Sequence, residues 1–247
     1  MLSVDRIMQK LDEHLSRNDY LSAERHLDYW LGEARLQGDD RAILFICNEL
    51  IGLHRKLSHR EQSLSFCQKA LSQVEAMNIA ENIGAATTYL NAATAYKAFG
   101  KAKEGIPLFE RALAIYRREL PPTDLRFGGL YNNMGLALCD LKEFEQAKAC
   151  YQKALENTTA NGSKPEEAVT HLNLATAAEQ EWGLEKGEGE IAKRIALAWA
   201  LLNDESLPWD GNYAFVCEKC APTFRYYGYF LYANQLEERA KRIYEGS

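Results

Sequence analysis

The stretch from Leu130 to Leu155, LYNNMGLALCDLKEFEQAKACYQKAL, has the pattern of two helices joined by a tight turn. Small residues occur where two helix backbones must approach each other, and larger apolar residues fill the space between them. The small residues are Gly135, Ala147 and Ala154, and the larger ones are Tyr131, Met134, Leu138, Leu141, Tyr151 and Leu155. A single helical pair cannot bury such a face, so the pattern predicts a stack of similar pairs.

Copies of this pattern recur along the chain every 40 to 42 residues. The clearest copy stands 42 residues earlier, with Tyr89, Ala93, Gly105, Phe109 and Ala112 at the equivalent positions. We predict an all-α fold of six helical pairs over residues 3–37, 41–78, 83–119, 125–158, 165–203 and 213–245. In the fifth pair, Gly183, Gly187 and Gly189 predict a longer connection between the helices, and residues 203–212 predict an inserted loop.

The order of small and aromatic residues resembles the tetratricopeptide repeat. The period is longer than the usual value of about 34 residues. With RALAIYRREL (111–120) followed by LYNNMG (130–135), it is similar to the repeats of kinesin light chains and related bacterial proteins. The resemblance implies one right-handed superhelical α-solenoid over residues 1–247, whose function is to bind other proteins.

Composition restricts the classes of partner and the compartment. The chain is 47% hydrophobic and 26% charged, as in ordinary soluble proteins. Its net charge of −6 argues against nucleic acid as the main partner, because phosphate binding needs a basic surface. The N-terminal segment lacks the apolar core of a signal peptide, and the longest apolar run, Ile195 to Leu202, is too short to span a bilayer. We expect a cytoplasmic protein with no membrane partner.

The positions of the cysteines and the absence of catalytic motifs argue against a metal site, a redox role and enzyme activity. Cys217 and Cys220 form a C-x-x-C pair, but zinc needs further ligands, and a redox role needs a strand-to-helix setting. Core packing of these thiols is the main interpretation, and a metal or redox role is the alternative. No nucleophile, phosphate-binding or metalloprotease motif occurs. We therefore expect no enzyme activity, no metal site and no cofactor.

Asparagines are the leading candidates for binding residues. In repeats of this kind the first helix of each pair lines the concave groove. Asn133 lies two residues before Gly135, Asn91 and Asn173 occupy the equivalent positions, and Asn48 lies beside that position in the second pair. An asparagine amide can donate to one backbone carbonyl and accept from one backbone N–H of an extended peptide. Alternatively, these side chains bond the neighbouring helix or hold water.

Further candidates follow along the same predicted face. One turn beyond the asparagines lie Thr94, Leu136 and Thr176, and beyond these come basic residues in the second and third pairs and acidic ones in the fourth and fifth. Such a groove could orient a peptide of mixed charge. The full set of predicted peptide-binding residues is Asn48, Arg55, Asn91, Thr94, Lys97, Asn133, Leu136, Asn173, Thr176, Tyr226 and Tyr229.

The segment TFRYYGYFLYAN (223–234) is rich in tyrosine. As a single helix it would place Tyr226, Tyr229 and Tyr232 on the groove side, where tyrosines suit a binding surface. Alternatively, the loop at residues 203–212 covers them, or they form a homodimer contact. The sequence thus predicts a non-catalytic scaffold for a peptide or extended protein segment. The alternatives are a regulator that senses a peptide or small molecule, and a self-associating assembly protein.

Overall fold

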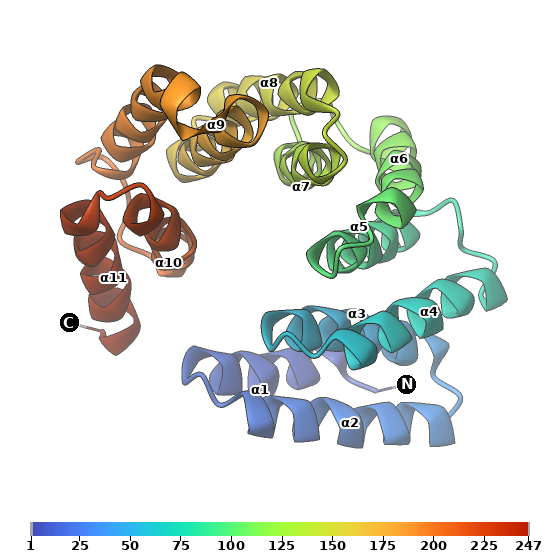
Figure 1. Cartoon of the computed structure of the whole chain (residues 1–247). Coiled ribbons are helices and arrows are strands. Elements are labelled where there is room, and N and C mark those ends of the chain that lie inside the picture. Colours follow the sequence, from blue (N-terminus) through green and yellow to red (C-terminus); the bar gives the residue numbers. More distant parts are fainter. Residues whose placement is uncertain (1, 247) are drawn as a thin grey trace. The chain divides into compact units, whose positions relative to one another are not determined.

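The computed structural model describes residues 2–246, and within them every regular element is a helix (Figure 1). The prediction of an all-helical repeat fold is therefore confirmed. The helices are α1 (Val4–Ser16), α2 (Tyr20–Leu36), α3 (Asp40–Lys56), α4 (Arg60–Ala76), α5 (Ile83–Ala98), α6 (Ala102–Glu119), α7 (Arg126–Asp140), α8 (Phe144–Ala160), α9 (Lys164–Leu202), α10 (Gly211–Tyr226) and α11 (Phe230–Glu245).

Consecutive helices form hairpins, and the hairpins form two compact units. Unit 1 ends at Leu120 and contains the hairpins α1–α2, α3–α4 and α5–α6. Unit 2 begins at Pro121 and contains α7–α8, the kinked helix α9 and α10–α11. The assignment of residues 1–247 to one superhelical domain remains a prediction.

The hairpin turns share one backbone geometry. Asn18, Ser58, Gly100, Lys142 and Gly228 adopt a positive φ directly after the first helix of each pair. The next residue then donates its N–H to the carbonyl five positions earlier; for example, Glu143 donates to Leu138 at 2.9 Å and Tyr229 to Phe224 at 2.9 Å. This is the Schellman arrangement, which satisfies the last carbonyls of a helix. It allows a two- or three-residue turn to reverse the chain.

Close packing inside the hairpins requires small residues at the positions that the sequence predicts. A Cβ atom on Gly135 would lie 2.6 Å from the Tyr151 ring, so only glycine admits this tyrosine. Gly105 of α6 approaches the Ala93 carbonyl of α5 in the same way, with 3.0 Å available to a Cβ atom. Tyr151 and Phe109 are completely buried in the two hairpins.

The longer connection predicted at residues 183–189 is wrong. Only Gly183 is non-helical, with φ 80° and ψ 166°, and the chain reverses at this one residue. Gly187 lies within the second half of α9, where a Cβ atom would be 3.3 Å from the Ala178 carbonyl oxygen. It therefore serves as a close-packing residue, as Gly105 does in α6, and the fifth pair has the same architecture as the others.

The single helix predicted over residues 223–234 is also wrong. Helix α10 ends at Tyr226, Gly228 has φ 85°, and α11 begins at Phe230. Gly228 thus occupies the turn position of Lys142 rather than the helix-packing position of Gly135. Tyr226 and Tyr229 consequently belong to different helices of the last hairpin.

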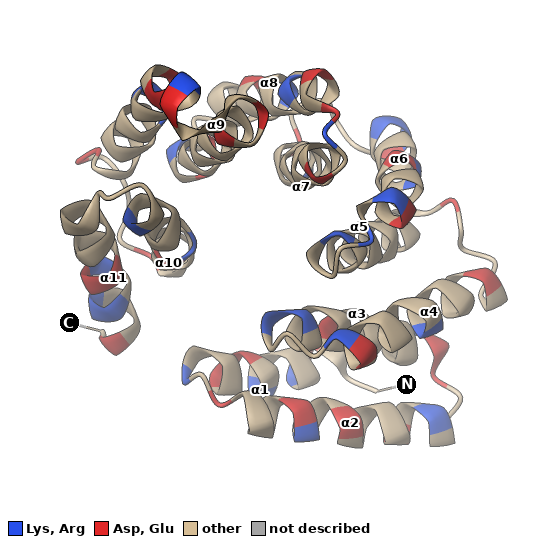
Figure 2. Cartoon of the chain, viewed as in Figure 1, with Lys and Arg blue, Asp and Glu red and all other residues tan. Residues whose placement is uncertain are grey.

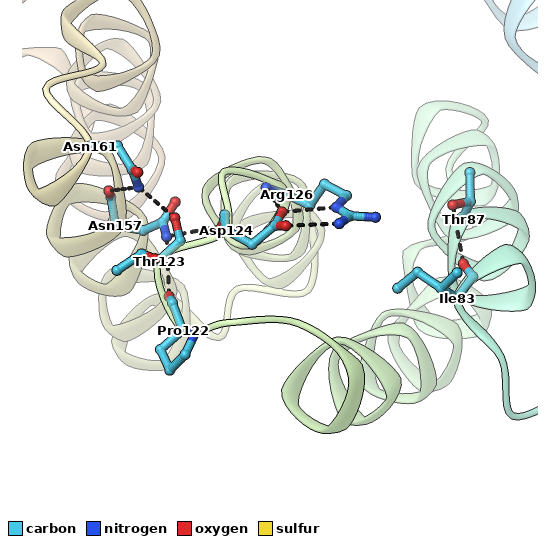
Figure 3. A network of polar contacts seen from close by, with 8 residues as sticks. All are labelled: Ile83, Thr87, Pro122, Thr123, Asp124, Arg126, Asn157 and Asn161. Atoms are coloured by element: carbon cyan, nitrogen blue, oxygen red, sulfur yellow. Dashed lines mark hydrogen bonds and ion pairs between the residues drawn. The ribbon is translucent and has the colours of Figure 1, made fainter.

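The start of unit 2 is fixed by Asn157 of α8 and by Asn161, the residue that caps the C-terminus of α8 (Figure 3). Asn161 donates its amide to the carbonyl of Thr123 at 2.8 Å, and Asn157 donates to that of Asp124 at 3.1 Å. The Asn157 Oδ1 atom also accepts the backbone N–H of Gly128 at 3.1 Å. These bonds satisfy the irregular segment after Pro122 and set the first turn of α7 against α8. Across the described chain, 2–246, no helix has the length and apolar character needed to cross a membrane.

Candidate functional site

The first helices of the pairs lie beside one another in each unit and form what we call the first-helix face. In unit 1 this face is made by α3 and α5, and in unit 2 by α7, the first half of α9 (residues 164–182) and α10. The two central helices carry little charge: α5 contains only Lys97, and α7 only Arg126 and Asp140 (Figure 2). Uncharged side chains therefore make up most of these two helices.

A ladder of amide and hydroxyl groups joins α3 to α5. Asn48 donates its amide to the Thr88 hydroxyl at 2.9 Å and to its own helix at the Leu44 carbonyl. Asn91 in turn donates to the Asn48 Oδ1 atom at 3.0 Å. The Thr88 hydroxyl in turn donates a hydrogen bond to the Gly84 carbonyl at 3.2 Å. Each group is thus oriented by the next, which fixes the register between the second and third hairpins.

The same ladder recurs in unit 2 between α7 and α9. Asn132 donates to the Thr170 hydroxyl at 2.9 Å, and Asn173 donates to the Asn132 Oδ1 atom at 2.9 Å. Thr170 donates to the Glu166 carbonyl at 3.0 Å. Asn132 was not among the predicted residues. The signal for it was Asn48, which stands 84 residues earlier at the equivalent position, with Leu90 between them.

The predicted asparagines therefore differ in their surroundings. Asn91 and Asn173 each donate one side-chain N–H to an asparagine of the neighbouring helix. This is the alternative interpretation that the sequence left open. Within the described chain their Oδ1 atoms accept no hydrogen bond. Asn133 is half-buried, and its side chain has no partner within residues 2–246. A half-buried amide without a partner retains two donors and an acceptor for a ligand.

A hollow of about 480 Å³ lies on the first-helix face of unit 2. It is lined by Thr176, Glu179, Gln180, Pro222, Thr223 and Tyr226. The Glu179 carboxylate accepts the hydroxyl of Tyr226 at 2.5 Å and that of Tyr227 at 2.7 Å. Burial and then the bond to Glu179 raise the pKa of Tyr227, so its hydroxyl stays protonated and donating. One wall of the hollow is thus formed by the Glu179 carboxylate, which hydrogen bonds from Tyr226 and Tyr227 hold in place.

The matching face of unit 1 is of mixed charge. Arg55 and Lys97 lie on α3 and α5 as predicted. Burial lowers the pKa of the Arg55 guanidinium, and burial followed by repulsion from Asp12 raises the pKa of the Glu49 carboxyl. The Thr94 hydroxyl donates to the Leu90 carbonyl at 2.8 Å, so its hydrogen is already used within α5.

The tyrosine-rich end separates into two groups. Tyr226 is 66% exposed beside Glu179, whereas Tyr229 stacks on Tyr232 with ring centroids 5.7 Å apart. Tyr232 stacks in turn on Trp199 of α9, with centroids 3.9 Å apart. Because the turn at Gly228 separates the two groups, the predicted row of Tyr226, Tyr229 and Tyr232 along one helix is wrong. Tyr226 alone lines the hollow.

The cysteines are free, and those of the C-x-x-C pair lie in the core of unit 2. Burial raises the pKa of Cys217 to about 11 and that of Cys220 to about 12, so both are protonated thiols at neutral pH. In the part of the chain that the structure describes, no third metal-ligating side chain joins them. Packing accounts for these two residues.

Comparison with known proteins identifies the class of the chain. Models of the tetratricopeptide repeat match residues 85–124 and 127–183, which cover α5–α6 and α7 with α8 and the first half of α9. The helices over these two segments are tetratricopeptide repeats. Such repeats indicate a scaffold for protein–protein interaction and are generally not catalytic. No curated protein sequence matches the chain.

Solved structures place the fold more narrowly. One similar structure holds the nearly identical TPR-like repeats of a protein assigned as a kinesin light chain in Podosopora anserina. It is 14% identical, covers 81% of this chain and 94% of that one, and gives a TM-score of 0.55. BtubC (BKLC) from P. vanneervenii is 18% identical over 94% of this chain and 91% of its own, with a TM-score of 0.57. The fold of the repeats is thus of the kinesin light chain-like type.

Proposed function

We propose that the chain is a non-catalytic interaction scaffold that binds an extended peptide segment of another protein on the first-helix face of unit 2. The observation that carries this proposal is Asn133, whose half-buried amide has no partner within residues 2–246. Because this amide is open to solvent, a ligand can replace the water on it and use its two donors and its acceptor. A ligand backbone is the partner that such a group, on a repeat scaffold, is suited to accept.

Asn173 provides a second contact on the next helix of the same face. Its Nδ2 atom is held by Asn132 at 2.9 Å, which fixes the direction of its uncommitted Oδ1 atom. Asn133 and Asn173 can therefore bond carbonyl and N–H groups of an extended chain without reading its side chains. Each such bond contributes about 0.5–1.5 kcal/mol, so the pair supports weak, sequence-tolerant binding.

The hollow, whose lining residue Thr176 lies one helical turn beyond Asn173, supplies a preference for charge. The two oxygens of the Glu179 carboxylate can accept further hydrogen bonds beyond those from the tyrosines. The exposed ring of Tyr226 adds apolar contact for the stem of a long side chain. The proposed ligand is therefore an extended segment that carries a lysine or arginine, with its charged end against Glu179.

Selection from a displayed library of linear peptides tests this proposal. The enriched peptides are synthesised, and their dissociation constants are measured by calorimetry for the wild type and two variants, Asn133→Ala and Glu179→Gln. Gln152→Ala is the matched control, because Gln152 is an exposed amide on α8, outside the first-helix face. Circular dichroism establishes that all four proteins fold alike.

We expect enriched peptides to contain a basic residue and to bind both site variants at least fivefold more weakly than the wild type. The Gln152→Ala variant should bind as the wild type does. Equal binding by all proteins would remove this face from the mechanism. Failure to enrich any peptide would favour the small-molecule sensor, and concentration-dependent light scattering would favour self-association.

A further inference from the structure

Two histidines and a glutamate meet where the first two hairpins of unit 1 pack together. His54 lies in the last turn of α3, His59 precedes the first residue of α4, and Glu24 lies on α2. One ligand atom from each of these three side chains lies within 4.8 Å of the other two. Within residues 2–246 no other group of three such side chains is gathered as closely. The peptide-binding proposal uses none of them.

The hairpin turn fixes the two imidazoles relative to each other. The His59 N–H donates to the His54 carbonyl at 2.8 Å, and Ser58 between them has φ 58°. The His54 ring is stacked on Phe66 with an interplanar angle of 7° and centroids 5.5 Å apart. The orientation of the His54 ring is thus set by packing and backbone rather than by solvent contacts.

Spacing between the donor atoms suits a metal ion better than a hydrogen bond. The Nδ1 atoms of His54 and His59 are 3.4 Å apart. His54 Nε2, the other nitrogen of that ring, is 3.9 Å from a Glu24 carboxylate oxygen, so the Glu24 or His54 side chain must rotate for one ion to bind all three ligands. Both distances exceed the usual 2.7–3.2 Å of a protein N–H hydrogen bond. Two ligands on a tetrahedral zinc ion, each bonded at 2.0–2.1 Å, stand about 3.4 Å apart. The two imidazoles therefore already have the separation of one edge of a coordination tetrahedron.

Charge and access also favour a cation here. Asp28 lies one turn beyond Glu24 on α2 and interacts electrostatically with both Glu24 and His54, so a second carboxylate faces the same place. The His54 side chain is 3% exposed and that of Glu24 is 30% exposed, while His59 is on the surface. An ion can therefore enter from the His59 side.

We propose that Glu24, His54 and His59 form a binding site for a divalent transition metal of the zinc type, which joins the first hairpin to the second. Two imidazoles and one carboxylate are ligands for zinc, cobalt or nickel rather than for calcium or magnesium, which take oxygen ligands. Water completes the coordination. Because the ligands come from α2, α3 and the start of α4, the ion crosslinks two repeats and stabilises their packing.

The test uses Zn²⁺ and Co²⁺ titrated into the full chain by calorimetry and visible absorption. The site variants are Glu24→Gln and His59→Gln, both at accessible positions outside the core. The matched control is His14→Gln, because His14 Nδ1 also lies 3.9 Å from a carboxylate, that of Asp19, without a third ligand. Each variant is first compared with the wild type by circular dichroism and thermal unfolding in the presence of a chelator.

We expect one Co²⁺ per chain, with a d–d spectrum typical of low coordination number and a metal-dependent rise in Tm. The affinity should fall at least tenfold in Glu24→Gln and in His59→Gln, and stay unchanged in His14→Gln. Absence of binding by the wild type overturns the proposal, as does unchanged affinity in either site variant. A thiolate charge-transfer band would also overturn it, since that band would place the ion on the cysteines.

Discussion

Gly135 and Gly129 lie on the same helix and differ in what a side chain there would meet. A Cβ atom on Gly135 would lie 2.6 Å from the Tyr151 ring, whereas nothing lies within 4 Å of one on Gly129. The buried tyrosine cannot move away, because its ring is completely enclosed between α7 and α8. The equivalent hairpin α5–α6 has the pair Ala93 and Phe109, and α9 has Ala175 and Ile191. Of these three pairs, the one with the largest residue on its second helix, Tyr151, thus has the smallest residue on its first helix, Gly135.

We predict that Gly135→Ala lowers the free energy of unfolding by about 1–3 kcal/mol, the usual cost of overpacking a core. Gly129→Ala is the control and should be neutral or stabilising, because alanine favours the helix by about 1 kcal/mol over glycine. Urea denaturation of both variants provides the measurement. An equal response of the two positions would mean that the contact with Tyr151 does not limit the packing.

His171 makes stability depend on pH. Burial, and then the Arg194 guanidinium that donates to its Nδ1 atom at 3.2 Å, lower the pKa of His171 to about 4. In the unfolded chain a histidine has a pKa of about 6.5. Between these two values the unfolded state binds a proton that the folded state does not, so stability is lost as the pH falls through this window.

We expect the wild type to lose about 2–3 kcal/mol of unfolding free energy to this group between pH 6.5 and pH 4, at roughly 1.4 kcal/mol per pKa unit. His171→Gln keeps a neutral acceptor for Arg194 and should show a correspondingly flatter profile. Thermal unfolding of both proteins across this pH range measures the difference between their unfolding free energies. The carboxylates contribute equally to both proteins, so their contribution cancels in this difference. Parallel profiles would show that folding does not lower the pKa of His171.

At the scale of helices, the asparagine ladders connect one hairpin to the next. Asn132 is 7% exposed and bonds both Thr170 and Asn173 across the α7–α9 contact. Truncation removes the amide that donates to the buried Thr170 hydroxyl and the oxygen that accepts from the half-buried Asn173 amide, which costs about 1–3 kcal/mol. We predict this loss for Asn132→Ala and a coupling energy of about 0.5–3 kcal/mol between Asn132→Ala and Asn173→Ala in a double-mutant cycle.

The control cycle combines Asn133→Ala with Asn173→Ala. Asn133 has no partner within residues 2–246, so its removal should be nearly neutral for stability and additive with the second change. Denaturant unfolding of the single and double variants measures both cycles. Coupling in the control cycle, or none in the first, would contradict the arrangement of the ladder.

Sequence reasoning located the helices well because the repeat pattern records contacts within one hairpin. Small residues such as Gly135 and Gly105 mark the helix crossings, and the crossings set the positions of the helices. It failed where glycine has two uses. Gly187 was assigned to a loop although it is a packing residue, and Gly228 was assigned to a helix although it forms a turn. The sequence alone does not distinguish close packing from a turn, because each requires a glycine.

The candidate site was predicted less completely, for a physical reason. Asn132 and Asn133 are adjacent in sequence, but Asn132 is buried in the ladder, whereas Asn133 is half-buried and has no partner within residues 2–246. Which of them bonds the next hairpin depends on the register between repeats, which a pattern within one repeat does not contain. The cluster of Glu24, His54 and His59 was missed for the same reason, since it draws on two hairpins.

At the scale of the whole chain, the central claim is that the first helices of unit 2, rather than the second ones, receive a peptide. Helices α7 and α10 and the first half of α9 hold Asn133, Asn173, Glu179 and Tyr226. Helices α8 and α11 belong to the opposite side of their hairpins and carry charged residues of both signs, as Figure 2 shows for α11. The two sets of helices therefore provide an internal comparison.

Photo-crosslinking tests this claim most directly. A peptide selected by the wild-type chain would carry a benzophenone side chain, and mass spectrometry would identify the crosslinked residues. The account predicts crosslinks within 126–140, 164–182 and 211–226, and their loss in Asn133→Ala. Crosslinks concentrated in α8 or α11, or unaffected by that substitution, would contradict it.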